Sequence, residues 1–108
     1  EQMNILLANK SRPTAVIAGN DMMALGVMDA IQERTLVVGK DISACGFDDV
    51  PVAAYTNPAL SHLRHPIYDI GRRCSRMMVD IPAGNAIKSK QVLLSPQLIV
   101  RESTGPKI

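Results

Sequence analysis

The sequence predicts an α/β fold built on a parallel sheet, and three observations carry this prediction. Residues 14–18 and 42–45 are short continuous apolar runs, the pattern of strands buried on both faces of a parallel sheet. Between them, residues 21–34 have the apolar spacing of a helix, and a strand–helix–strand order implies a right-handed crossover between parallel strands. The length of 108 residues and the apolar content of 46% fit a single globular domain.

The helix predicted at 21–34 presents two apolar edges. Met22 and Leu25 lie off the inward stripe, so they either widen the core face or belong to a surface that meets a partner. The inward stripe consists of Ala24, Val27, Met28 and Ile31.

The remaining segments follow from the same kind of pattern. Pro51 opens a short helix, because proline is favoured in a first helical turn. The strongest helical stripe runs from Ile67 to Ile81 and includes Cys74. In order, the expected elements are a helix end at 1–9, a short helix at 51–55, a strand at 61–64, the helix at 67–81, strands at 91–94 and 98–101, and a fraying polar tail at 102–108.

Composition and charge give no support to several classes of function. The net charge of +2 is too small to indicate a nucleic-acid surface, and Arg72, Arg73 and Arg76 fit a solvated helix face. Cys45 and Cys74 lie on apolar stripes, so both are expected to be buried, reduced thiols. No signal peptide and no apolar run of membrane-spanning length is present, which favours a cytoplasmic protein without membrane contact.

One polar cluster has a positional argument for binding. Asn20 and Asp21 follow the strand at 14–18, and Asp48 and Asp49 follow the strand at 42–45. If these strands are neighbours, the side chains stand at one edge of the sheet, where parallel sheets bind ligands. A carboxylate that accepts from hydroxyls and an amide that both donates and accepts suit a sugar or polyol. The alternative is that these residues only cap the segments that follow them.

An enzymatic interpretation of the same carboxylates is weaker. A metal-assisted hydrolase would need a histidine ligand near them, and His62 and His65 stand three apart on a strand, so they point to opposite faces. The sequence has no GxGxxG motif and no phosphate loop, so it predicts no nucleotide cofactor. The chain is therefore expected to need no cofactor and not to be an enzyme.

Three stretches together resemble the lactose/galactose repressor (LacI/GalR) family of bacterial transcription regulators. They read RPTAVIAGNDMMALGVMDAI, DISACGFDDVPVAAYTNPALSHLRHPIYDIG and LLSPQLIVRESTG, in the family's order and spacing. The resemblance covers nearly the whole chain. It implies the carboxy-terminal part of that family's effector-binding core, which has the type I periplasmic-binding-protein fold, a parallel-sheet sandwich of two lobes.

The resemblance also implies roles for individual residues. Carried over by position, Asn20 and Asp48 bind the effector, which is a sugar or purine held between the lobes, and Ile67 lies near the pocket. Asp49 is then the structural acid of the pair. The homodimer surface includes Met22, Leu25, Val52 and Tyr55. Thr35 stands where the family often has glycine with positive φ, at a cost of about 1 kcal/mol.

By the same resemblance, the chain divides between two lobes. Residues 1–65 and 92–108 belong to the carboxy-terminal lobe, and residues 66–91 belong to the amino-terminal lobe. The helix at 67–81 is then expected to have little within this chain to cover its apolar stripe. The chain is expected to be a piece of a sugar-responsive repressor without its helix-turn-helix headpiece, so that operator DNA is contacted only by the parent protein. The alternatives are a periplasmic-type sugar-binding protein and a dimerisation module that binds no effector.

Overall fold

The structure, a computed structural model, describes residues 1–86 and 90–106. It divides into two units. The first consists of Glu1–Arg64 and Leu98–Ile108, and the second of His65–Gln97. The assignment of these two units to two lobes of a larger core stays a prediction.

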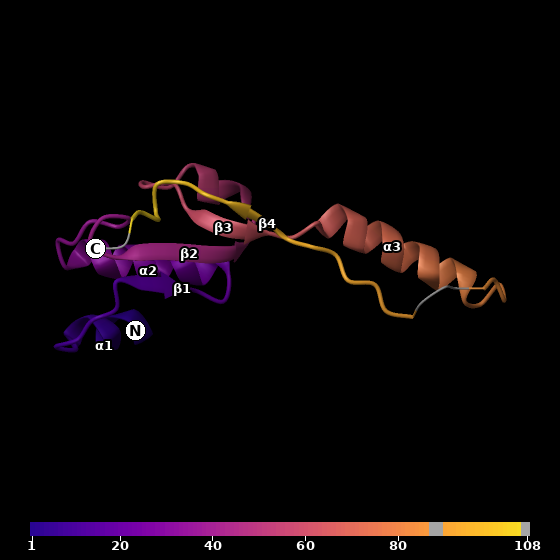
Figure 1. The fold of residues 1–108 in the computed structure, drawn as a ribbon, viewed down its shortest axis with the longest axis horizontal. Coiled ribbons are helices and arrows are strands. Elements are labelled where there is room, and N and C mark those ends of the chain that lie inside the picture. Colours follow the sequence, from indigo (N-terminus) through magenta and orange to yellow (C-terminus); the bar gives the residue numbers. More distant parts are fainter. Residues whose placement is uncertain (87–89, 107–108) are drawn as a thin grey trace. The chain divides into compact units, whose positions relative to one another are not determined.

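The first unit is built on a four-stranded sheet in the order β1-β2-β3-β4 (Figure 1). The strands are β1 (Ala15–Ile17), β2 (Ser43–Asp48), β3 (Ser61–Arg64) and β4 (Gln97–Ile99). β1 pairs with β2, and β2 with β3, both in parallel, with Ile17 opposite Cys45 and Gly46 opposite His62. The parallel α/β fold predicted from the sequence is confirmed.

Helix α2 (Asp21–Glu33) connects β1 to β2 and packs on the sheet (Figure 1). Its buried side chains include Ala24, Met28 and Ile31, as the helical spacing predicts, whereas Val27 is only half-buried. Helix α1 (Gln2–Ala8) buries Met3 and Leu7 in the same core and packs on α2. Further buried apolar side chains of this core come from β2 and from the segments just before β2 and β3, namely Ala44, Ile42 and Leu60.

β1 is not the fully buried strand that its apolar run predicts. It lies at the edge of the sheet, and the side chain of Ile17 is 80% exposed. Its neighbour in the run, Val16, is half-buried and packs on the core. A continuous apolar run is typical of a strand that is buried on both faces. In this chain the described residues cover only the face of β1 that meets α2.

The tail does not fray over its first residues. Ser103 is fully buried, where its hydroxyl donates to the carbonyl of Ala44 (2.7 Å) and accepts from the amide of Ser61 (2.8 Å). The Ser61 hydroxyl also lies 2.8 Å from that of Thr104. The polar composition of the tail therefore serves to bond it to β2 and β3. Residues 107–108 lie outside the described residues.

Two local features follow the sequence closely. A 3₁₀ helix, η1 (Pro51–Ala54), begins at the predicted proline and buries Ala53. After α2, Thr35 has φ of 57°, so the positive φ expected at this non-glycine position is confirmed.

The second unit consists mainly of helix α3 (Ile67–Asp80), and no described residue of that helix is buried. The helix begins where it was predicted, and its apolar stripe has little to pack against, as expected. Cys74 is exposed, so the prediction that both thiols are buried is wrong for it. Residues 91–94 form no strand, because nothing among the described residues forms a ladder with them.

Candidate functional site

Two of the predicted binding residues lie at the carboxyl ends of β1 and β2. Ile17 and Cys45 are partners in the parallel ladder, and the Ala18 amide donates to the Cys45 carbonyl (2.9 Å). Asn20 and Asp48 each lie three residues beyond these partners, at the same edge of the sheet. This edge is where open parallel sheets place ligands.

Asn20 has two uses for its side chain. Its Oδ1 accepts a hydrogen bond from the Met23 amide (2.8 Å), which caps the first turn of α2. Its NH₂ group donates to no described residue in any hydrogen bond found in the structure. The capping interpretation is therefore correct for Asn20, and the cap leaves two N–H donors for a ligand.

Asp48 ends β2 in an unusual backbone conformation. Its φ is 130°, and that of Asp49 is 86°. Aspartate tolerates positive φ better than most residues, and such conformations are more frequent at functional sites. Asp48 is half-buried. The next residue, Asp49, is held by contacts with other segments, so the backbone of Asp48 is fixed on its carboxyl-terminal side.

Asp21 anchors this edge from within. It is fully buried, and its Oδ2 accepts from the amides of Asp49 (3.0 Å) and Val50 (2.9 Å). It therefore joins the start of α2 to the segment after β2. Gly46 makes this approach possible, because a Cβ there would stand 2.2 Å from Asp21 Oδ1. Aspartate also suits the positive end of the α2 dipole.

His62 lies between two carboxylates and is fully buried. Its Nδ1 stands 3.0 Å from Asp21 Oδ2, in an ion-pair contact without the alignment of a hydrogen bond. Its Nε2 stands 2.9 Å from Asp49 Oδ1. Arg64 donates to both oxygens of Asp49, which holds the pKa of the Asp49 carboxyl below its usual range although burial opposes this. Asp21, His62, Asp49 and Arg64 form what we call the clamp, of which Asp21 and His62 are fully buried.

The clamp affects a neighbouring thiol. Burial raises the pKa of Cys45, and the charge of the nearby Asp21 carboxylate adds to the rise. The thiolate is therefore disfavoured, and Cys45 behaves as a half-buried apolar side chain.

The other predicted site residues are placed as follows. Ile67 opens α3 in the second unit and is exposed. Met22 and Tyr55, predicted for a dimer surface, are 63% and 86% exposed, and Val52 is also exposed. Leu25 is half-buried and packs against the core, which favours the wider core face for that residue.

The clamp was missed by sequence reasoning, which took His62 as an ordinary polar histidine and Asp21 as a cap. No motif marks it. His62 enters the site because the parallel register sets it opposite Gly46, where a missing side chain leaves room for Asp21. The signal would have been a glycine and a histidine at paired positions of two adjacent strands.

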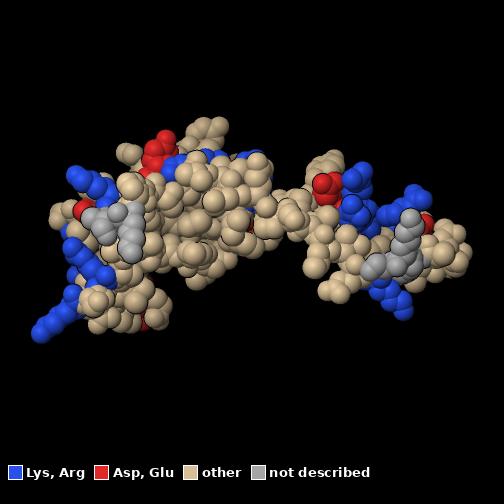
Figure 2. All heavy atoms as spheres, in the orientation of Figure 1, with Lys and Arg blue, Asp and Glu red and all other residues tan. Residues whose placement is uncertain are grey.

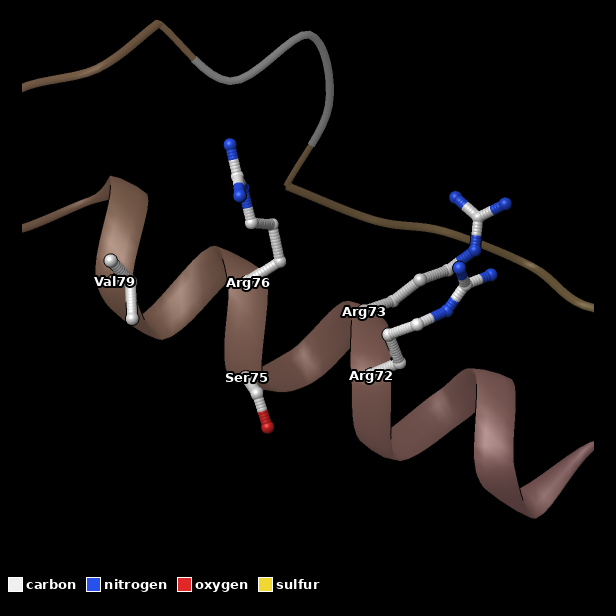
Figure 3. A pocket seen from close by; sticks show the side chains of 5 residues that line it. All are labelled: Arg72, Arg73, Ser75, Arg76 and Val79. Carbon is white, nitrogen blue, oxygen red and sulfur yellow. The ribbon is translucent and has the colours of Figure 1, made fainter.

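A hollow of about 620 Å³ lies on α3 and is lined by Arg72, Arg73, Ser75, Arg76 and Val79 (Figure 3). Arg72 pairs with Asp69 and Arg76 with Asp80, all four on the same helix. Figure 2 shows basic and acidic side chains next to one another on this unit. The arginines thus form the solvated helix face that was predicted.

Among the described residues, no group of three His, Cys, Asp or Glu side chains is arranged to hold a metal ion. No helix that the structure describes has the length and hydropathy needed to cross a membrane.

Comparison with known proteins gives consistent matches. Residues 1–104 match the family described as periplasmic binding protein-like domain. The chain is 39% identical over 103 residues to the HTH-type transcriptional repressor PurR of Erwinia tasmaniensis, covering 95% of this chain and 30% of that protein. The chain spans about a third of the length of such curated relatives.

Solved structures agree with these sequence matches. A regulatory protein of the LacI family from Chloroflexus aggregans superposes with a TM-score of 0.88 at 43% identity, over 95% of this chain and 37% of that one. The lac repressor dimer bound to operator and the anti-inducer ONPF gives a TM-score of 0.89 at 34% identity, over 97% of this chain and 36% of that one.

Proposed function

Because the chain belongs to the periplasmic binding protein-like family and, within it, to the LacI-family transcriptional regulators, we propose that it forms part of an effector-binding and dimerisation core. The parent protein would be a transcriptional repressor that responds to a small molecule, in the cytoplasm. The role is binding, without a cofactor and without catalysis. Operator DNA would be contacted by a headpiece outside these 108 residues.

The observation that carries the proposal is that Asn20 and Asp48 follow paired positions of two neighbouring strands, at one edge of the sheet. The carboxylate accepts hydrogen bonds, and the Asn20 NH₂ group donates them, because its oxygen is engaged by Met23. Adjacent hydroxyls on a ring both donate and accept, so a sugar matches this pair better than an anion does. We therefore propose a sugar as the effector.

We also propose Ile67, the exposed first residue of α3, as an apolar effector contact. In the proposed core the effector lies between two lobes, and its binding shifts their relative angle and thereby the DNA-binding competence of the dimer. Most contacts that select one sugar over another would come from parts of the core beyond this chain.

A homodimer surface would form on α2 and the segment that follows β2. Hydrogen bonds tie these two segments at both ends, from the Val50 amide to Asp21 and from the Gln32 side chain to the Asn57 carbonyl (2.8 Å). Met22, Val52 and Tyr55 are exposed on them, outside the core. Exposed apolar side chains on two segments held together fit a protein interface.

Titration of the complete core with monosaccharides, disaccharides and purine bases tests the effector site. The Asp48→Ala variant should lose about 1.5–3 kcal/mol of affinity for the compound that binds, because charge-assisted hydrogen bonds are lost. Asp48→Asn separates the loss of the charge from any change in the backbone, since asparagine also tolerates positive φ.

Asp41→Ala is the matched control. The Asp41 carboxylate accepts from the Val37 amide (2.7 Å) outside the proposed site, so this variant should bind normally. Unchanged binding by both Asp48 variants would contradict the assignment, and so would a core that binds none of the compounds.

A further inference from the structure

The two residues of the proposed effector site differ in the backbone conformation that holds them. Asn20 is extended, with φ of −155°, and its side chain caps α2. Asp48 and Asp49 instead have φ of 130° and 86°, a region that residues with a Cβ rarely adopt. Such a conformation is sterically costly and persists only where the surrounding structure holds it. The position of Asp48 therefore depends on what holds the segment that follows it.

One side chain holds that segment through its backbone. Asp21 Oδ2 accepts hydrogen bonds from the amides of Asp49 (3.0 Å) and Val50 (2.9 Å), the two residues after Asp48. The Asp21 side chain is fully buried, and hydrogen bonds to a carboxylate are stronger than those between neutral groups. The two bonds fix both peptide planes that flank Asp49, and the first of these planes joins Asp49 to Asp48.

The same aspartate is the chain neighbour of Asn20. Asp21 is the first residue of α2, and Asn20 is bonded to the first turn of that helix twice. The Asn20 side chain accepts from the Met23 amide (2.8 Å), and its carbonyl accepts from the Ala24 amide (3.0 Å). Asp21 therefore cannot move without moving Asn20. A single side chain thus joins the backbone of one effector residue to that of the other.

Gly46, two residues before Asp48, provides the space for this side chain. A Cβ there would stand 2.2 Å from Asp21 Oδ1. Asp21 Oδ1 itself has no hydrogen-bond partner, and His62 Nδ1 stands 3.0 Å from Oδ2 without the alignment of a hydrogen bond. Among the hydrogen bonds of the described residues, the amides of Asp49 and Val50 are thus the donors to Asp21.

We propose that Asp21 is a positioning residue for the effector site, which fixes Asp48 relative to Asn20 through the amides of Asp49 and Val50. The proposal rests on the proposed function only for what Asn20 and Asp48 bind. Without the Asp21 carboxylate both amides lose their acceptor, and the backbone of Asp48 and Asp49 relaxes to negative φ. The Asp48 side chain then leaves the place where it and Asn20 contact the same sugar.

The first test needs no effector, because NMR of the 108-residue chain reports on the backbone. The coupling between the amide and α protons of Asp48 depends on φ and should be small in the unsubstituted chain. The amides of Asp49 and Val50 should exchange slowly with solvent. In Asp21→Ala the coupling should rise and both amides should exchange faster. The Val37 amide is the control, because it donates to the carboxylate of Asp41 and should keep its rate.

Asp21→Asn is the matched variant. Because Asp21 Oδ1 has no partner, an NH₂ group can replace it without the loss of a hydrogen bond, and the remaining oxygen can accept from both amides. This variant should keep the small Asp48 coupling and the slow exchange. The proposal is overturned if Asp21→Asn behaves like Asp21→Ala. It is also overturned if the Asp49 and Val50 amides of the unsubstituted chain exchange as fast as in an unfolded chain, a measurement that does not require Asp21→Ala to fold.

Binding measurements then separate positioning from stability. For the monosaccharide or disaccharide that binds the unsubstituted complete core, Asp21→Ala should weaken the affinity at least about tenfold, and Asp21→Asn should restore most of it. Ile31→Ala is the control for stability, because it removes a fully buried apolar side chain from the same helix and should leave the affinity unchanged. Equal losses of affinity in Asp21→Ala and Ile31→Ala overturn the positioning role. If no sugar binds but the couplings and exchange rates are as expected, Asp21 fixes Asp48 and the effector assignment fails.

Discussion

The two helices of this chain that show apolar stripes differ in what the stripes meet. α2, in the first unit, buries Ala24, Met28 and Ile31 in a core shared with the sheet, whereas the described residues of α3, in the second unit, are all at least partly exposed. The periodicity of α3 is the cleaner of the two in the sequence. Periodicity thus predicts the type of element, while its stabilisation depends on the surface that covers the stripe.

The units also differ in their ion pairs. In the first unit His62 and Asp21 are fully buried and Asp49 is half-buried, and they connect three separate segments. In the second unit Arg72–Asp69 and Arg76–Asp80 join neighbouring turns of one helix. Pairs of the second kind contribute little to stability, since they are exposed to solvent. The first kind fixes the relative positions of segments, which is the requirement of a binding site.

Replacing one isoleucine in each helix gives the largest expected difference. Ile31→Ala in α2 should lower the free energy of unfolding by about 2–5 kcal/mol, because a fully buried side chain is lost and a cavity remains. Ile70→Ala in α3, where the side chain is 40% exposed, should change it by less than about 1 kcal/mol. Urea denaturation followed by circular dichroism measures both. A large loss for Ile70→Ala would show that α3 is covered in solution, for instance by a second copy.

Adding a methyl group to one glycine in each unit sharpens the same contrast. Gly46→Ala places a Cβ 2.2 Å from Asp21 Oδ1 and 3.1 Å from Asp21 Cα, so it should destabilise the first unit by about 1–3 kcal/mol. Gly71→Ala in α3 meets nothing within 4 Å and should stabilise that helix by roughly 0.5–1 kcal/mol through helix propensity. Thermal unfolding of the two variants compares them. Equal changes in stability for the two variants would mean that Asp21 does not stay close to Gly46 in solution.

The ends of the two helices allow a smaller test. Thr35, after α2, has φ of 57°, and Gly84, after α3, has φ of 72°. Thr35→Gly should raise the free energy of unfolding by about 1 kcal/mol, because glycine adopts positive φ without steric cost. Gly84→Thr should reduce the helicity of α3, because threonine at this positive φ has the same steric cost that Thr35 already has. No gain in Thr35→Gly would argue against the left-handed conformation at that position.

Acidification should produce the smallest effect. The pKa of Asp49 is lower in the folded chain than its ordinary value of 3.8, so its ion pairs stabilise the fold above that value. This contribution is lost as the pH falls through the folded pKa. Urea midpoints measured from about pH 5 downward should therefore drop more steeply in the unsubstituted chain than in Asp49→Asn. Parallel pH profiles would show that Asp49 does not cause the loss of stability at low pH.

Much of the fold was determined by the sequence itself. Continuous apolar runs, helical spacing and Pro51 predicted the order and type of nearly every element, because each depends on residues close together in the chain. The placement of Asn20 and Asp48 at one edge of the sheet was also predictable, since parallel strands bring their carboxyl ends to one edge. The segment at 91–94 was the exception, because a strand exists only where another strand pairs with it.

Only the tertiary structure decided which side chains are buried and which of them meet. Ile17 and Cys74 look buried in the sequence and are exposed, because burial depends on a covering surface that local pattern does not report. The contact of His62 with Asp21 and Asp49 joins three segments through the register of β2 and β3 and the missing side chain of Gly46. The sequence therefore determined which residues could bind, and the packing of the strands decided how they are held.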